Sequence, residues 1–370
     1  MENIQSAQLV VSCLSLDETV TFFKDRLGFR VDMISPADDP SVTIISGYGL
    51  QIRLERNTDH STQSLGTIRL HLKDESDVDT NETTDLVAPN GTKIQLVKTN
   101  SKLTIPPINQ SFVLSRMNTD NQWIKGRAGM NYRDLIPDRQ GGRFIASHIQ
   151  IPNGGIVNDH VHYHNIRFQM IYVYKGWVRL VYEDQGDPFV LHAGDCVLQP
   201  PLIRHRVLES SPGLEVIERA CPAVHDTFID HNMELPNTTQ QVNRLYGEGQ
   251  RFLKYISTEE KLQWQPWRLP GFKCQDLGIG AATQGLAGSK IIHSNGDVMC
   301  QPCQHKAEFV FLFILKGQLS LHINEQIIEK LTDGDAFVLP ENITYAFTHW
   351  SNDLQLLEVS FPAHFQTTLQ

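Results

Sequence analysis

An internal repeat with a period of about 140 residues restricts the fold of this sequence more than any other feature. Each copy consists of short apolar or alternating runs broken by glycine and proline, which is typical of an antiparallel barrel or sandwich rather than a helical domain. We therefore predict two equal, mainly β domains in tandem. The recurring segments and their counterparts are residues 123–135 and 266–277, 173–180 and 314–321, 193–205 and 333–345, and 214–223 and 354–363.

Chain length and the repeat together define the expected domains. At 370 residues the chain exceeds what one hydrophobic core usually supports, so two or three domains are expected. We place the first repeated domain at residues 101–230 and the second at residues 263–370. A polar linker with one short helix is expected over residues 231–262, and a separate small domain over residues 1–100.

The small first domain is expected to have a β-α-β-β-β order. Residues 7–12 predict a strand, residues 16–29 have the periodicity of an amphipathic helix, and apolar alternation near residues 42–55 predicts further strands. A shorter unit follows, in which residues 67–74 and 88–98 predict strands. The order indicates a small α+β domain ahead of the repeat.

Residues 5–99 resemble the vicinal-oxygen-chelate fold of glyoxalases and bleomycin-resistance proteins, notably in LVVSCLSLDETVTFFKDRLGFRV and APNGTKIQLV. In metal-binding members of that family, four ligands sit on strands at places that fall here on Gln8, Arg53, Thr67 and Gln95. An arginine cannot ligate a cation, and a threonine hydroxyl with two amides makes a poor site for a divalent transition metal. We therefore expect this domain to hold no metal and catalysis to lie elsewhere.

Three histidines in the first repeat have the spacing of metal ligands. His162 and His164 are two residues apart, which in a strand aims both imidazoles at one face. Gln169 follows five residues later, and His205 lies eleven residues after Gly194, behind a Pro-Pro corner. The pattern resembles the two cupin motifs, HxHxxxxExxxxxxG and GxxxxxPxGxxH. It implies two tandem cupin (jelly-roll) β-barrels.

The resemblance implies one divalent metal ion per chain, held by His162, His164 and His205 with Gln169 as a fourth ligand. Neutral imidazoles on adjacent strands can converge on one cation and leave coordination positions open. Because Gln169 replaces the usual Glu, the site would carry one positive charge more than a three-His, one-Glu site.

Two further residues bear on the ligand set. Leu202 stands where the second motif usually has Gly. His160 shares the strand parity of His162 and His164, so it is an alternative ligand or a partner of a ligand.

The second repeat retains little of the histidine pattern. Cys303, His305, Val310 and Tyr345 stand at the equivalent places. A valine cannot coordinate a metal, so we expect the second barrel to have lost its metal and to serve as a packing partner. An alternative interpretation takes Cys300, Cys303 and His305 as a CxxCxH soft-metal or redox site.

The two-barrel architecture resembles bicupin dioxygenases of the gentisate type. It implies an oxidoreductase with a mononuclear non-haem Fe(II) centre that acts on a small acidic or aromatic metabolite. Candidate substrate contacts are Arg204, Tyr172 and Arg167, since arginine can grip a carboxylate with two parallel hydrogen bonds. Two alternatives stay open: an isomerase, lyase or hydrolase that uses Mn, Ni or Zn as a Lewis acid, and a non-catalytic small-molecule-binding cupin.

Composition bears on partners and location. A net charge of -10 and a pI near 5.8, with no run of Lys or Arg, disfavour nucleic acid and anionic lipid as partners. The sequence shows no secretion signal and no membrane-spanning apolar stretch, and its six cysteines are mostly scattered, so we expect a reduced, cytoplasmic location. A homodimer is a further expectation, because cupins and glyoxalase-like modules often complete their sheets across subunits.

Overall fold

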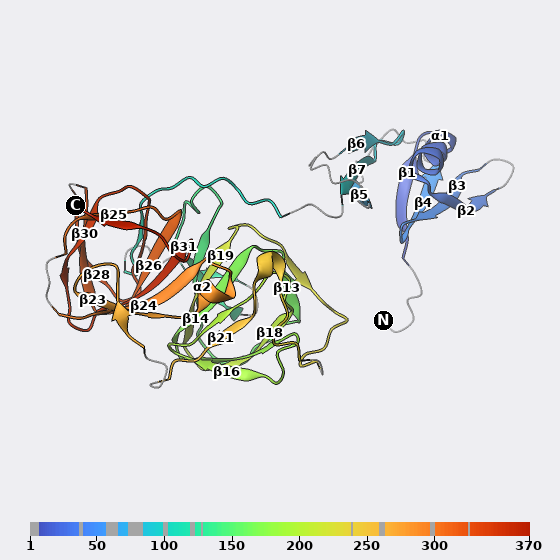
Figure 1. Ribbon diagram of the computed structural model, residues 1–370. Coiled ribbons are helices and arrows are strands. Elements are labelled where there is room, and N and C mark those ends of the chain that lie inside the picture. The colour runs from blue at the N-terminus through green and yellow to red at the C-terminus, as the bar shows by residue number, and fades with distance from the viewer. Residues whose placement is uncertain are drawn as a thin grey trace. The chain divides into compact units, whose positions relative to one another are not determined.

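The computed structural model shows a mainly β chain that divides into two compact units, residues 1–102 and residues 103–370 (Figure 1). No helix among the residues that the structure describes is long and apolar enough to cross a membrane. The described residues are 7–36, 40–56, 66–72, 84–98, 103–118, 123–126, 129–237, 240–258, 263–296, 300–324 and 326–370.

The first unit contains the expected β-α-β-β-β order. Its helix begins as α1 (Leu16–Thr21) and continues with π-helical geometry as η1 (Phe22–Arg26). One sheet has the order β1-β4-β3-β2, with β1 parallel to β4, and the other has the order β5-β7-β6, with β5 parallel to β7. The strands are β1 (Leu9–Cys13), β2 (Arg30–Ser35), β3 (Val42–Gly47), β4 (Leu50–Arg56), β5 (Thr67–Leu72), β6 (Thr84–Val87) and β7 (Lys93–Lys98).

Polar side chains at three of the four positions that the glyoxalase resemblance singles out contact protein groups. The guanidinium of Arg53 lies 2.6 Å from the carboxylate of Glu55, the Gln8 amide donates to Gln51, and Gln95 accepts from Arg69. Thr67 begins β5. Residues 73–74 of the strand expected there lie outside the described residues.

The second unit consists of two barrels with the same strand order, which confirms the repeat. The first barrel combines the sheet β9-β10-β11-β19-β14-β17-β21 with the sheet β16-β15-β18-β13-β20, where β12 also pairs with β18. The second barrel combines β22-β23-β24-β31-β26-β29-β8 with β28-β27-β30-β25-β32. Each position in one series has its counterpart in the other, so both copies fold into the predicted jelly-roll barrels.

Both barrels are built from short strands. In the first barrel they are β9 (Ile124–Lys125), β10 (Asn131–Asp134), β11 (Ile145–Ile151), β12 (Gly155–Ile156), β13 (His162–His164), β14 (Phe168–Lys175), β15 (Trp177–Tyr182), β16 (Phe189–His192), β17 (Cys196–Leu198), β18 (His205–Ser210), β19 (Leu214–Cys221), β20 (Thr227–Ile229) and β21 (Leu253–Tyr255). In the second they are β8 (Val113–Ser115), β22 (Gln265–Pro266), β23 (Phe272–Asp276), β24 (Gly288–Ser294), β25 (Cys303–His305), β26 (Phe309–Lys316), β27 (Gln318–Ile323), β28 (Gln326–Thr332), β29 (Ala336–Leu339), β30 (Tyr345–Trp350), β31 (Gln355–Phe361) and β32 (Thr367–Leu369). The short helices of this unit are η3 (Gly247–Gly249) and α2 (Ile279–Ala282).

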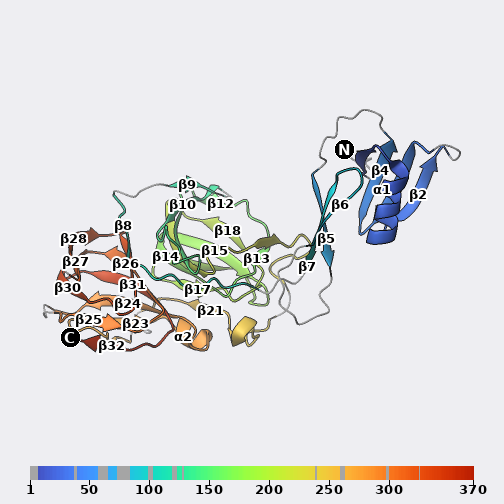
Figure 2. The ribbon, with the colours of Figure 1, turned by 90° about the horizontal axis from the view of Figure 1, so that it is seen from above.

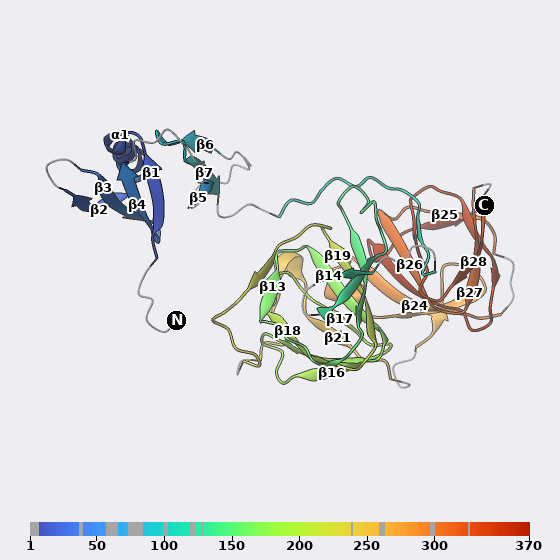
Figure 3. The same cartoon turned by 180° about the vertical axis from the view of Figure 1, so that it is seen from behind.

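Each barrel receives one strand from the segment that precedes the other barrel. Strand β8 pairs with β29 among the strands of the second barrel (Figure 2), and β21 pairs with β17 of the first (Figure 3). Matching aspartates support the two exchanged segments: Asp335 accepts from the backbone N–H of Met117 and Asp195 from that of Ser257, both at 2.7 Å. The segment expected as a linker, residues 231–262, therefore contributes a strand to the first barrel.

The two barrels share one hydrophobic core. Phe144 of the first barrel stacks on Phe309 of the second, with ring centroids 4.2 Å apart. The buried guanidinium of Arg219 lies between Phe309 and Phe311, at 4.6 and 3.9 Å from their ring centroids. Contacts of this kind hold the barrels together as one unit.

The interior of the second barrel is filled by apolar side chains around one buried ion pair. Arg268 donates to the carboxylate of Glu358, which is 2% exposed. The Trp267 indole N–H lies 3.4 Å from the other oxygen of this carboxylate, and the guanidinium lies 4.1 Å from the Trp267 ring centroid. The positive charge of Arg268 thus neutralises the buried carboxylate of Glu358.

Replacing Arg268 by Ala should destabilise the second unit by about 3–5 kcal/mol, because Glu358 would remain buried without its partner. Chemical denaturation of the two proteins measures the difference. The double variant Arg268→Ala/Glu358→Gln should recover part of the loss, because it removes the uncompensated charge. A loss below about 1 kcal/mol in the single variant would contradict a buried, unshared ion pair.

Candidate metal centre

Three histidines of the first barrel converge as the sequence predicts. Strand β13 pairs with β18 in a register that places His162 opposite His205. His164 lies on the same face of β13 as His162, because alternate residues of a strand share a face. The ring centroids are 4.2 Å apart for His162 and His205, 5.2 Å for His164 and His205, and 5.3 Å for His162 and His164. One nitrogen of each ring lies within 4.8 Å of the others.

Backbone carbonyls fix the orientation of two of these rings. The Nδ1–H of His162 donates to the carbonyl of His160 at 2.7 Å, and that of His205 donates to the carbonyl of Ile203 at 3.0 Å. The Nδ1 of His164 lies 2.9 Å from the hydroxyl of Thr227. A proton on Nδ1 leaves Nε2 as the nitrogen with a lone pair, which is the arrangement that metal-bound histidines use. The donor set therefore fits one divalent metal ion.

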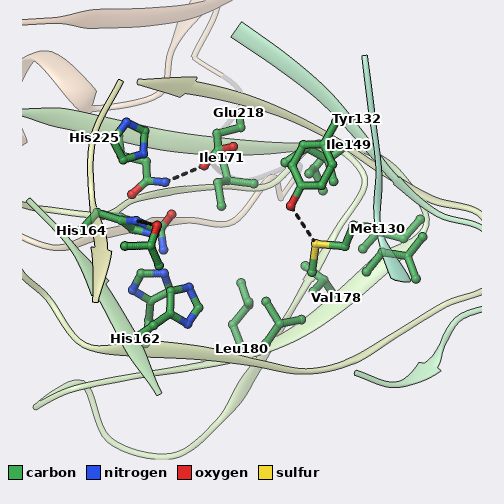
Figure 4. Close-up of a pocket in the computed structure, with 18 residues that line it drawn as sticks. Met130, Tyr132, Ile149, His162, His164, Ile171, Val178, Leu180, Glu218 and His225 are labelled. Atoms are coloured by element: carbon green, nitrogen blue, oxygen red, sulfur yellow. Dashed lines mark hydrogen bonds between the residues drawn. The ribbon is translucent and has the colours of Figure 1, made fainter. Parts of the chain in front are cut away.

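The histidines lie at one end of a cavity of about 220 Å³ (Figure 4). In the close-up, His162, His164 and His225 lie on one side and Tyr132 and Met130 on the other. Strands of both sheets supply the walls, so the cavity is the interior of the barrel. Its lining residues are Met130, Tyr132, Ile149, Ile151, His162, His164, Gln169, Ile171, Val178, Leu180, Gln199, His205, Val207, Leu214, Val216, Glu218, His225 and Thr227.

Gln169, the expected fourth ligand, lines the cavity and is 2% exposed. Its amide nitrogen donates to the carboxylate of Glu218 at 2.5 Å. Glu218 lies on β19, where it pairs with Ile171 of β14. Sequence reasoning missed this carboxylate, although one signal was present: the second repeat carries Glu358 at the equivalent place.

A fourth histidine, His225, was also missed. It follows β19, and its ring centroid lies 5.4 Å from that of His164. Its Nδ1–H donates to the carbonyl of Pro222 at 3.1 Å, so Nε2 is again the nitrogen with a lone pair. No spacing rule connects His225 to the motif, and the second repeat has Phe365 at the equivalent place.

The expected substrate contacts, Arg204, Tyr172 and Arg167, are not among the described residues that line the cavity. Arg204 lies 3.3 Å from the carboxylate of Asp230, and Arg167 makes two hydrogen bonds to Glu248, at 2.8 and 3.0 Å. Tyr172 points into the core shared by the barrels, because it has the opposite strand parity to the cavity-lining residues of β14. Burial raises the pKa of its phenol, so Tyr172 stays protonated.

Two other residues singled out by the motifs have backbone roles. The side chain of His160 is exposed, and the residue supports His162 through its carbonyl. Leu202 has a φ of 64°, in the left-handed region that favours glycine. It therefore adopts the backbone conformation that explains the usual Gly at this place.

The second barrel keeps the strand register of the site but has only one histidine, His305, at the equivalent places. Cys303 of β25 pairs with Tyr345 of β30, as His162 pairs with His205. Burial lowers the pKa of His305 to about 4. Within the described ranges, His162, His164 and His205 form the one cluster of three or more His, Cys, Asp or Glu side chains close enough to hold a metal. The alternative of a CxxCxH site is therefore not supported.

Known proteins were compared with this chain at the levels of sequence and structure. No family model matches the sequence, and no curated protein matches it. Among solved structures, salicylate 1,2-dioxygenase from Pseudaminobacter salicylatoxidans is similar with a TM-score of 0.53 and 15% identity, over 72% of this chain and 90% of that chain. Oxalate decarboxylase from Lactobacillus farciminis, in a formate complex, is similar with a TM-score of 0.51 and 14% identity, over 72% and 91%.

At such identities the likeness concerns the fold alone. It agrees with the matching strand orders of the two repeats and with the histidines that the motifs place in the first barrel. The chain therefore has the bicupin fold, two jelly-roll barrels in tandem, behind a small α+β unit.

Proposed function

We propose that this protein is a mononuclear non-haem Fe(II) dioxygenase whose metal is held by His162, His164 and His205. The observation that carries the proposal is the convergence of three oriented imidazoles at the end of a mostly apolar cavity. Three protein ligands leave coordination positions open, as catalytic centres require and closed structural sites do not. The fold shared with salicylate 1,2-dioxygenase supports an oxygenase by analogy.

The chain's own groups have separate roles in this proposal. The imidazoles would hold the metal, and iron, when bound, would bring dioxygen and an organic substrate together and pass electrons from the substrate to dioxygen. The aliphatic walls exclude water from the reacting end of the cavity. Glu218, held by Gln169, is the carboxylate that can accept a hydrogen bond from a substrate hydroxyl.

Glu218 also favours a second candidate function. A carboxylate beside a Lewis-acidic Mn, Ni or Zn ion is the pairing that a lyase, isomerase or hydrolase needs to move a proton. Oxalate decarboxylase has the same fold, which supports this reading by analogy. In both candidates the substrate is a small molecule that enters the first barrel.

Elemental analysis of protein purified without added metal tests the metal site. We expect about one divalent metal per chain in the wild type, and a loss of at least tenfold in His162→Ala and His205→Ala, because each variant removes one of three ligands. His305→Ala is the matched control, since His305 is the buried histidine of the equivalent strand, and it should retain the metal. Metal retained in the first two variants would contradict the proposed ligands.

Oxygen consumption distinguishes the candidate reactions. The iron-loaded protein should take up dioxygen when it is mixed with a panel of phenols and ketones, and His205→Ala should not. Turnover of a compound without oxygen uptake, in protein loaded with Mn, Ni or Zn, would replace the dioxygenase by the Lewis-acid enzyme. Metal binding without turnover of any compound would leave a small-molecule-binding protein.

Exchanging the partners of the Gln169–Glu218 hydrogen bond tests whether position 169 faces the metal. Gln169→Glu should lower the free energy of unfolding of the metal-free protein by about 1–3 kcal/mol, because it replaces a buried hydrogen bond by two facing carboxylates. Metal should then raise the melting temperature more than in the wild type, since an anionic ligand replaces a neutral one. The swap Gln169→Glu/Glu218→Gln should restore the metal-free stability. An equal response to metal in wild type and Gln169→Glu would place residue 169 outside the coordination sphere.

A further inference from the structure

We infer that the first barrel selects a neutral, largely apolar molecule of about the size of one substituted ring, with hydroxyl or carbonyl oxygens at one end only. The inference rests on the proposed metal site and adds the chemical class of the substrate. The resemblance implies a small acidic or aromatic substrate, and the inference narrows this to a ring without an acidic group away from the metal, since the arginines expected to bind such a group do not line the cavity.

The cavity separates polar from apolar groups along its length. The histidines, Thr227, Gln169 and Glu218 gather where β13, β14 and β18 to β20 meet. Figure 4 shows Met130, Tyr132 and Val178 away from this cluster. The Tyr132 hydroxyl lies 3.4 Å from the sulfur of Met130, a weak acceptor. Apart from this phenol, the residues that Figure 4 labels beside Tyr132 are apolar, namely Met130, Ile149 and Val178. The other apolar residues that line the cavity are Ile151, Ile171, Leu180, Val207, Leu214 and Val216. A ligand must therefore have one polar and one apolar end.

Charge sets a second limit on the ligand. Among the described residues no lysine or arginine lines the cavity, whereas one carboxylate, Glu218, does. Imidazoles that bind a metal are neutral, so the metal would be the single compensating cation, and it lies at the polar end. A carboxylate carried into the apolar end would be buried without a partner, which is strongly unfavourable. The ligand should therefore be uncharged away from the metal.

Volume sets the third limit. The cavity measures about 220 Å³, and an apolar cavity of about 150 Å³ accommodates benzene. The first barrel thus has room for one ring with a few substituent atoms. A small dicarboxylate such as oxalate would leave the aliphatic walls uncovered.

Calorimetric titration of the zinc-loaded protein with two matched compounds tests the inference, because zinc supports binding without oxidation. Methylcatechol has chelating hydroxyls and an apolar far end, and protocatechuate has the same ring with a carboxylate in place of the methyl group. We expect methylcatechol to bind at least tenfold more tightly. Equal or tighter binding of protocatechuate, or no binding of either compound to protein that holds zinc, would overturn the inference.

Met130→Lys provides a charge-reversal test at the apolar end, because lysine has a similar length and unbranched shape. This variant should bind protocatechuate at least tenfold more tightly than the wild type does, and Met130→Leu should keep the wild-type preference. An unchanged preference in Met130→Lys that still holds zinc would overturn the inference. Zinc content measured on the same samples distinguishes failure of the proposed metal site from failure of the inferred substrate class. Protein without zinc would overturn the proposed metal site and, with it, the orientation of the ligand.

Discussion

The antiparallel register between β13 and β18 is the constraint on which the candidate site depends. It places His162 opposite His205, and the alternation of side chains adds His164 to the same face. Carbonyls within two residues of each ring, those of His160 and Ile203, then accept the Nδ1–H groups. Ring position and ring orientation therefore both follow from the backbone of two short strands, and the rest of the barrel keeps those strands in register.

The two barrels share one strand order but differ in the side chains of their interiors. The register of Cys303 and Tyr345 repeats that of His162 and His205, and Glu358 repeats Glu218. In the second barrel the guanidinium of Arg268 donates to Glu358, the counterpart of Glu218. The rings of Trp267 and Phe365 pack against this guanidinium. The first barrel leaves a cavity instead. Packed apolar side chains therefore fill the interior of the second barrel. The shared core and the exchanged strands connect this barrel to the first.

Local periodicity made part of this structure predictable. The repeat predicted two β domains, and the two-residue spacing of His162 and His164 predicted a shared face, because strand alternation is a local property. Glu218 and His225 could not be placed, since their approach to the histidines depends on which strands pair. Tyr172 shows the same limit: it is one residue from the cavity-lining Ile171, yet it faces the opposite side of β14. The exchange of β8 and β21 also joins segments far apart in sequence, which periodicity does not reveal.

X-ray absorption spectroscopy of the zinc-loaded full-length chain tests the central claim most directly, because it reports the atoms bound to the metal. The account predicts three imidazole nitrogens at about 2.0–2.1 Å and no sulfur ligand. A sulfur shell at about 2.3 Å would place the metal at a cysteine and would contradict the account.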